Sequence, residues 1–184
     1  QAAVLEKIAT LPDGKWSYEM TIDGYDKPLT LKACLTKSPE GILVDYEGTS
    51  PSVARGINVP MAYTKAYTVF GLACVISPDV PNNAGSLTPY QVIAPPGCVL
   101  NAQRPAPVST RHVIGQMLPD MVFGCLRHPL PDRVPAEGTS CLWNIAVRGR
   151  WKPRGPDESR TWPLYKSDAA DEPSTAHPGG RLSL

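Results

Sequence analysis

The polar cluster at residues 109–116, STRHVIGQ, carries the side chains best suited to chemistry in this sequence. Ser109 can cap a helix, and a helix N-terminus offers unpaired N–H groups and partial positive charge to an anionic ligand. Arg111 can hold a carboxylate or phosphate through two hydrogen bonds, and His112 can transfer a proton near neutral pH. We therefore predict that His112 is catalytic. The predicted substrate-binding residues of this cluster are Ser109, Arg111 and Gln116; the alternative is a helix cap, a solvated arginine and a structural histidine.

A second polar cluster, residues 45–50, follows an expected strand and leads into residues 55–58. Loops on a rigid scaffold often present functional side chains. This cluster therefore predicts Asp45 as a catalytic carboxylate and Asn58 as a substrate-binding residue. Asp and Ser also occur in ordinary turns, where their side chains accept hydrogen bonds from the nearby backbone. Both interpretations stay open at the level of sequence.

Motifs for nucleophiles, nucleotides and metals are absent from the sequence. It contains no GxSxG, GxxxxGK(S/T) or HExxH, and no GxGxxG after an expected strand. The histidines His112, His128 and His177 are too widely spaced for local metal ligation, and no cysteines form a CxxC pair. We therefore assign no metal ligands, although the sequence does not decide whether the protein needs a metal. The cysteines, which we expect to be reduced, are Cys34, Cys74, Cys98, Cys125 and Cys141.

The charge balance excludes several classes of partner. The chain has 18 Lys and Arg against 17 Asp and Glu among 184 residues, so it lacks the excess positive charge that nucleic-acid phosphates attract. It has no run of about 18 apolar residues that could span a bilayer, and its N-terminus has no signal-peptide pattern. Together with reduced cysteines, these features predict a cytoplasmic protein that binds neither nucleic acid nor membranes.

Periodicity predicts the elements that must position these residues. Alternating apolar and polar side chains indicate three strands joined by turns of hairpin length into an antiparallel meander, and a further short strand later in the chain. An apolar stretch at 61–76 predicts a buried helix. Ser109 begins another expected helix that extends to about residue 126, and Pro119 would kink or divide it. The predicted strands lie at 16–22, 29–36, 42–46 and 90–94.

These elements predict an α+β fold in which the antiparallel meander packs against two main helices. We assign residues 1–150 to this domain. Residues 151–184 are polar and rich in proline and glycine, and we expect them to form an extended or partly mobile arm. The 21 prolines and 15 glycines of the chain thus fall mainly in loops and in the arm.

Six strings, in order along the chain, resemble the hydantoinase B/5-oxoprolinase family, whose N-methylhydantoinase B-type subunits are called HyuB. Because members of that family are considerably longer, the chain resembles a middle-to-C-terminal portion of such a subunit. The metal-holding stretch of related carboxylase subunits precedes this region, and the chain has no match to it. The six strings are VDYEGTSP at 44–51, GINVP at 56–60, PDVPNNAG at 78–85, VIAPPGCVLN at 92–101, PAPVSTRH at 105–112 and AHPG at 176–179.

The resemblance implies part of an ATP-dependent hydrolase that opens cyclic amides such as hydantoin, N-methylhydantoin or 5-oxoproline. A HyuA-like partner would use ATP to phosphorylate the ring carbonyl oxygen. The HyuB-like subunit would then assist ring opening by water within a hetero-oligomer, and we expect the isolated chain to be inactive. Two alternatives stay open: an interface module without catalytic groups of its own, and a subunit of an ATP-dependent acetone or acetophenone carboxylase.

Overall fold

The computed structural model describes residues 1–136, 138, 146–151 and 160–165. The chain divides into two units, residues 1–140 and 141–184, and each is considered by itself. In the second unit, strands β5 (Ala146–Trp151) and β6 (Arg160–Tyr165) form an antiparallel pair. Apart from residue 151 and β6, the arm predicted at 151–184 lies outside the described residues.

The first unit is built on a four-stranded sheet in the order β1-β2-β3-β4. The first three strands pair antiparallel, which confirms the predicted meander. The fourth strand pairs parallel to β3 because the chain crosses over through a helix between them. The sheet is therefore mixed, within the α+β class predicted from the sequence. Its strands are β1 (Gly14–Ile22), β2 (Leu29–Ser38), β3 (Gly41–Asp45) and β4 (Tyr90–Ile93).

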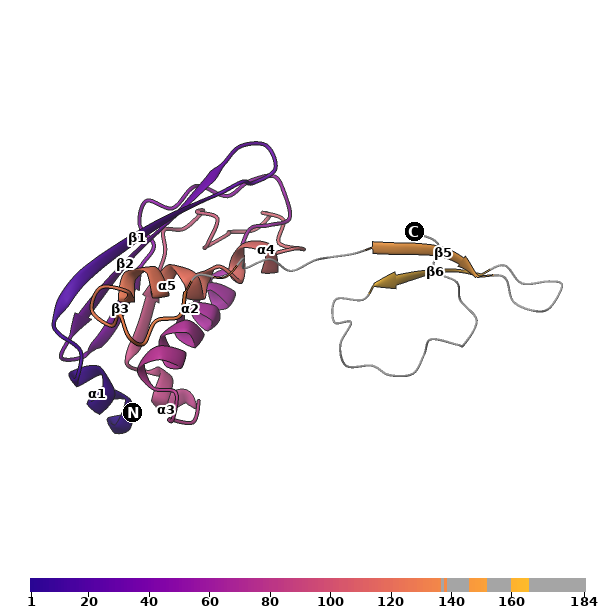
Figure 1. Ribbon diagram of the computed structural model, residues 1–184. Helices are drawn as coiled ribbons and strands as arrows, with labels where there is room; N and C mark the ends of the chain where they lie inside the picture. Colours follow the sequence, from indigo (N-terminus) through magenta and orange to yellow (C-terminus); the bar gives the residue numbers. More distant parts are fainter. Residues whose placement is uncertain (137, 139–145, 152–159, 166–184) are drawn as a thin grey trace. The chain divides into compact units, whose positions relative to one another are not determined.

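Helices cover one face of this sheet (Figure 1). The two longer helices at the core, α2 and α5, lie side by side; α5 contacts β1 and β2, and α2 contacts β4. The predicted helix at 61–76 is confirmed as α2. The helices are α1 (Ala2–Ala9), α2 (Met61–Ile76), α3 (Ala84–Leu87), α4 (His112–Gly115) and α5 (Leu118–Leu126).

Apolar burial holds the two layers together. On β2 every second side chain is buried, and on β1 alternate side chains are half-buried against the same core. Each fully buried leucine contributes roughly 1.5–3 kcal/mol relative to an exposed one. These are the faces that the alternation predicted. The core-facing side chains are Leu29, Leu31, Ala33 and Leu35 on β2, and Trp16, Tyr18, Met20 and Ile22 on β1.

The helix predicted from Ser109 to about residue 126 is divided, and it begins later than expected. Helix α4 starts after Arg111, and no side chain caps it. Pro119 lies in the first turn of α5, where a helix needs no N–H donor. The cap predicted for Ser109 is therefore wrong. With only four residues, α4 does not provide the aligned peptide dipoles that the predicted anion site required.

Buried hydroxyl groups tie α2 to its surroundings. Tyr46 Oη and Thr68 Oγ1 form a hydrogen bond of 2.7 Å, and Thr64 Oγ1 donates to the Leu100 carbonyl oxygen at 2.6 Å. Burial raises the pKa of Tyr46 well above its usual value. Because these hydroxyl groups have partners, the helix avoids the cost of burying unsatisfied polar atoms.

Two glycines allow α5 to approach its neighbours closely. A Cβ at Gly71 of α2 would lie 2.8 Å from Val122 Cγ2 and 2.9 Å from Pro119 Cα, both in α5. A Cβ at Gly124 of α5 would overlap the ring of Tyr18 on β1. The two helices and the sheet therefore meet at positions where only a hydrogen atom fits.

We expect Gly124→Ala to destabilise the fold by about 1–3 kcal/mol, because the added methyl group would displace Tyr18 or push α5 away from the sheet. Urea denaturation followed by circular dichroism measures this change in the free energy of unfolding. Ala66→Ser, on the exposed face of α2, is the control and should change it by less than about 0.5 kcal/mol. Equal stability of Gly124→Ala and the wild type would contradict this packing.

Candidate functional site

A buried amide side chain joins the two loops that carry most of the predicted site residues. Asn58 is fully buried, and its Nδ2 donates to the carbonyl oxygens of Val53, Arg55 and Pro107 at 2.8–2.9 Å. Its Oδ1 accepts a hydrogen bond of 2.8 Å from the Val53 N–H. Because its donors are used within the protein, the geometry supports a positioning role for Asn58 rather than contact with a substrate.

Ser109 takes part in the same contact between loops. The Thr110 N–H donates to the Gly56 carbonyl oxygen at 2.8 Å, and a Cβ at Gly56 would overlap Ser109 Oγ. Ser109 is exposed. The structure thus brings Ser109 next to the loop that Asn58 holds.

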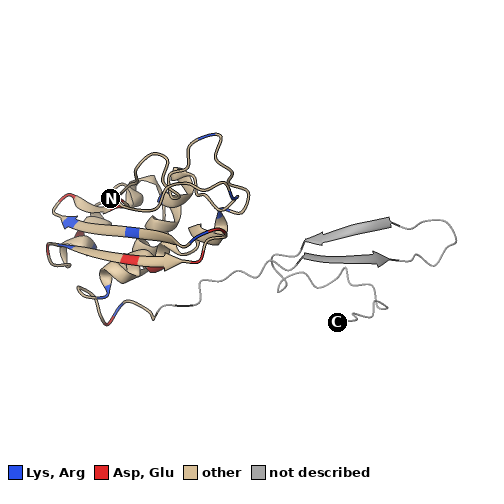
Figure 2. Cartoon of the chain, turned by 90° about the horizontal axis from the view of Figure 1, so that it is seen from above, with Lys and Arg blue, Asp and Glu red and all other residues tan. Residues whose placement is uncertain are grey.

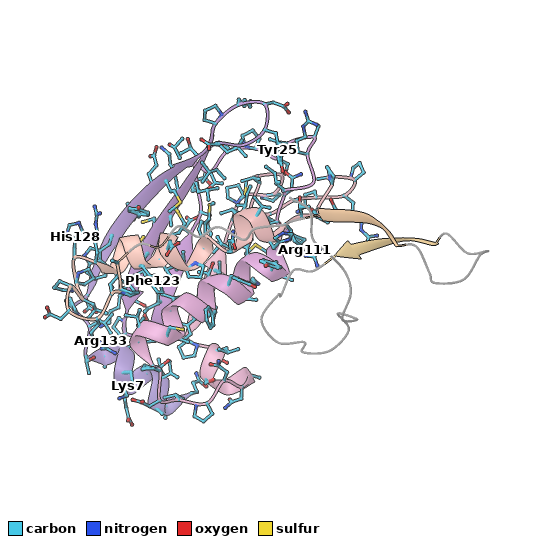
Figure 3. The ribbon with its side chains drawn as sticks, turned by 45° about the vertical axis from the view of Figure 1, so that its right-hand side comes forward. Lys7, Tyr25, Arg111, Phe123, His128 and Arg133 are labelled. Atoms are coloured by element: carbon cyan, nitrogen blue, oxygen red, sulfur yellow. The ribbon has the colours of Figure 1, made fainter. Side chains whose placement is uncertain are left out.

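Arg111 lies on the surface beside an aromatic stack from α2 (Figure 3). Its Nη1 donates to the Val108 carbonyl oxygen at 3.3 Å, and its Cζ lies 5.8 Å from the ring centre of Tyr63. Tyr63 stacks on Tyr67 with ring centres 4.4 Å apart. Burial, followed by the hydrogen bond with Tyr67, raises the pKa of Tyr63 to about 12. This phenol therefore stays neutral at physiological pH and does not cancel the charge of Arg111.

His112 and Gln116 lie at the two ends of α4. The Gln116 N–H donates to the His112 carbonyl oxygen at 3.1 Å. Both residues are half-buried and have interaction partners. Helix α4 therefore holds Arg111, His112 and Gln116 within two turns of helix.

Asp45 belongs to the sheet, at the last position of β3. Its Oδ1 accepts a hydrogen bond of 3.0 Å from the Glu47 N–H, which is the local bond that aspartate makes in turns. In the register of the sheet it lies opposite Cys34 of β2 and Ile93 of β4. The structure supports the turn interpretation of this residue.

A hollow of about 270 Å³ lies between the β1–β2 turn and the loop after β3. Arg55 and Asp26 form a two-point ion pair there, with Nε 3.2 Å from Oδ2 and Nη2 2.8 Å from Oδ1. The hydrogen bonds from Arg55, and then its charge, lower the pKa of Asp26. None of the six predicted site residues lines this hollow. Its lining includes Tyr25, Asp26, Lys27, Leu29, Val53 and Arg55.

Sequence reasoning missed this hollow because the two residues of its ion pair lie 29 positions apart in the chain. Residues 23–28 have the pattern of a turn between strands. The available signal was the tripeptide Tyr-Asp-Lys at 25–27. An aromatic side chain and a lysine are unusual where turns favour glycine, asparagine and aspartate.

The described residues show neither a metal centre nor a membrane span. Among them, no group of three His, Cys, Asp or Glu side chains could hold a metal ion. No helix in that part of the chain is long and apolar enough to cross a membrane. Figure 2 shows Lys and Arg interspersed with Asp and Glu along the described part. His177 and Cys141 lie outside the described residues.

Comparison with known proteins gives one family. A family model described as hydantoinase B/oxoprolinase matches residues 1–179. An uncharacterized protein of Methanocaldococcus jannaschii is 38% identical over 110 residues, which cover 59% of this chain and 20% of that protein. A putative B-type subunit of a D-/L-hydantoinase, from Pseudomonas sp. strain NS671, is 28% identical over 159 residues, which cover 79% of this chain and 27% of that protein.

Among solved structures, the ATP-dependent caprolactamase from Pseudomonas jessenii has the same fold, with a TM-score of 0.72 at 23% sequence identity. The match covers 88% of this chain and 32% of that one. The chain thus spans 20% and 27% of the length of the two curated relatives.

We expect Asn58→Ala to destabilise the fold by about 2–4 kcal/mol, because it leaves three carbonyl oxygens and one N–H without their partner. Thermal and urea unfolding of the purified variant measure the loss. Asn82→Ala removes the same side chain at an exposed position and should stay within about 0.5 kcal/mol of the wild type. A small effect of both substitutions would show that the amide does not hold the loops.

Alkylation of the described cysteines should follow their exposure. Cys74 is exposed and Cys125 is buried, and burial raises the pKa of Cys125 to about 12. A raised pKa leaves less of the reactive thiolate at a given pH. We therefore expect iodoacetamide at about pH 8.5 to label Cys74 first and Cys125 only in denaturant, as read by peptide mass spectrometry. Similar rates for the two in the folded protein would contradict this burial.

Proposed function

Because the chain belongs to the hydantoinase B/oxoprolinase family, as its sequence strings predicted, we propose that it forms part of a subunit that opens cyclic amides by ATP-dependent hydrolysis. The family match over residues 1–179 carries this proposal. The name of the Pseudomonas relative points to hydantoins, and the family name points also to oxoproline. Both are five-membered ring amides, so the proposed substrates are hydantoin, N-methylhydantoin or 5-oxoproline.

The proposed partner is a HyuA-like subunit that uses ATP. A relative that is named as one lettered subunit of a hydantoinase supports the existence of another, and the absence of a GxxxxGK(S/T) motif from the sequence agrees with ATP binding elsewhere. Phosphorylation of the ring carbonyl oxygen would make its carbon more electrophilic. Water would then attack this carbon, the ring C–N bond would break, and the nitrogen would take a proton. We propose that this hetero-oligomer works in the cytoplasm.

In this proposal the region around α4 meets the phosphorylated ring. Arg111 is exposed and keeps its charge beside the neutral Tyr63, so it would bind the anionic group. His112 would transfer the proton to the ring nitrogen, and Gln116 would contact the ring amide. Asn58 and Ser109 would position this region through the loop contacts described above.

Asp45 has no role in this proposal, since its carboxylate serves the turn to Glu47. A second candidate function is an interface module without its own catalytic groups. Tyr67 and Phe70 favour it, because these side chains of α2 are 36% and 56% exposed and exposed aromatic side chains often mark contact surfaces.

In an assembly of the complete subunit with a HyuA-like partner, we expect Arg111→Ala to lower kcat/KM for ATP-dependent hydantoin hydrolysis about tenfold or more. Loss of the charge-assisted hydrogen bonds to the phosphorylated ring is the physical reason. Ring opening and ADP release, measured together, give the rate. Arg127→Ala is the matched control, because Arg127 is also exposed and lies over a tyrosine ring, with Cζ 5.5 Å from the centre of Tyr18.

Unchanged turnover in both Arg111→Ala and His112→Ala would remove the two residues from the site and favour the interface module. Hydrolysis by the isolated chain would instead rule out that module. Consumption of acetone that depends on ATP and bicarbonate, without hydantoin hydrolysis, would select the carboxylase alternative.

A further inference from the structure

The hollow beside Arg55 has the features of a binding site for a small molecule. Its volume of about 270 Å³ lies just below the roughly 300–1,000 Å³ of pockets that take drug-sized ligands. Its lining combines the apolar side chains of Leu29 and Val53 with the charged side chains of Asp26, Lys27 and Arg55. An apolar surface with a few convergent polar groups is typical of sites that orient a small ligand.

The backbone on both sides of the hollow is held by contacts that a ligand would not disturb. Asn58, which is fully buried, bonds to the backbone of Val53 and Arg55 from behind. In the β1–β2 turn, Gly24 has a φ of +57°, and a side chain there would overlap the Lys27 carbonyl oxygen. Little backbone ordering would therefore accompany binding, which favours affinity.

Arg55 has one hydrogen-bonding edge occupied and one open. Asp26 takes hydrogens of Nε and Nη2, whereas Nη1 donates to no residue in the described part of the chain. Because a guanidinium carries five donors in a planar fork, its Nη1–Nη2 edge can hold a carboxylate at two points while Asp26 fixes its orientation. Lys27 adds a second positive charge, so cations outnumber anions in the lining.

We propose that this hollow binds a small organic carboxylate, whose charged group takes the open edge of Arg55 and whose apolar part packs on Leu29 and Val53. The ring of Tyr25, which lies 5.9 Å from the Arg55 Cζ and is 68% exposed, borders the opening (Figure 3). The apolar lining favours a ring or chain attached to the anion over a bare ion. This inference goes beyond the proposed function, because it assigns binding to this chain without ATP or a partner.

Proton–nitrogen correlation NMR of the full 184-residue chain tests the proposal with three probes. 5-Oxoproline carries a ring and a carboxylate, 2-pyrrolidinone has the same ring without the carboxylate, and inorganic phosphate is an anion alone. With 5-oxoproline we expect saturable shifts of the amide signals of residues 25–27 and 52–55, with a Kd of about 1 mM. The other two probes should bind about tenfold or more weakly.

Arg55→Gln should weaken the binding of 5-oxoproline about tenfold or more. Its unfolding midpoint should stay close to that of the wild type, since an exposed ion pair contributes little to stability. Lys32→Gln is the matched control: it breaks the comparably exposed Lys32–Glu19 ion pair of the sheet, and it should bind 5-oxoproline as the wild type does.

Four results would overturn the proposal: no saturable shift with 5-oxoproline, shifts confined to other residues, equal binding of 2-pyrrolidinone or phosphate, or undiminished binding by Arg55→Gln. Because the readout is binding by the chain alone, its failure is distinct from a failure of ATP-dependent hydrolysis in the assembly.

Discussion

The buried amide of Asn58 is the interaction on which both candidate sites depend. It holds the backbone of loop 53–58 from within and joins this loop to Pro107. On one side the loop presents Arg55 to the hollow. On the other, Gly56 accepts the hydrogen bond of Thr110, which leads directly into α4. A side-chain amide suits this role because it offers donors and an acceptor in one plane, and burial makes their loss costly.

The loops rest on two closely packed layers. Gly124 lets α5 approach the sheet and Gly71 lets α2 approach α5, so strands and helices share one core. The hydrogen bond between Tyr46 and Thr68 links the residue after β3 to α2 inside that core. Dense packing leaves little room for the loop ends to shift. Polar groups on the loops are thereby held at defined positions, as a binding site requires.

Local periodicity was enough to predict most of the fold. Alternation identified β1, β2 and β3 and the buried face of the first two, because one face of each strand meets the helices and the other meets water. Length and apolarity identified α2. The direction of β4 was not predictable from its own residues, because a four-residue strand carries no signal for parallel or antiparallel pairing. The crossover through α2 decides it.

The sequence by itself determined the strand and helix periods and, through six ordered strings, the family to which the chain belongs. Only the tertiary structure decided the roles of single polar residues: Asn58 bonds to three loop segments, and Arg55 pairs with Asp26 from a distant turn. The physical reason is that periodicity reflects local contact with core or water. Burial and pairing of a polar side chain depend instead on segments far apart in the chain, which meet only when the core forms.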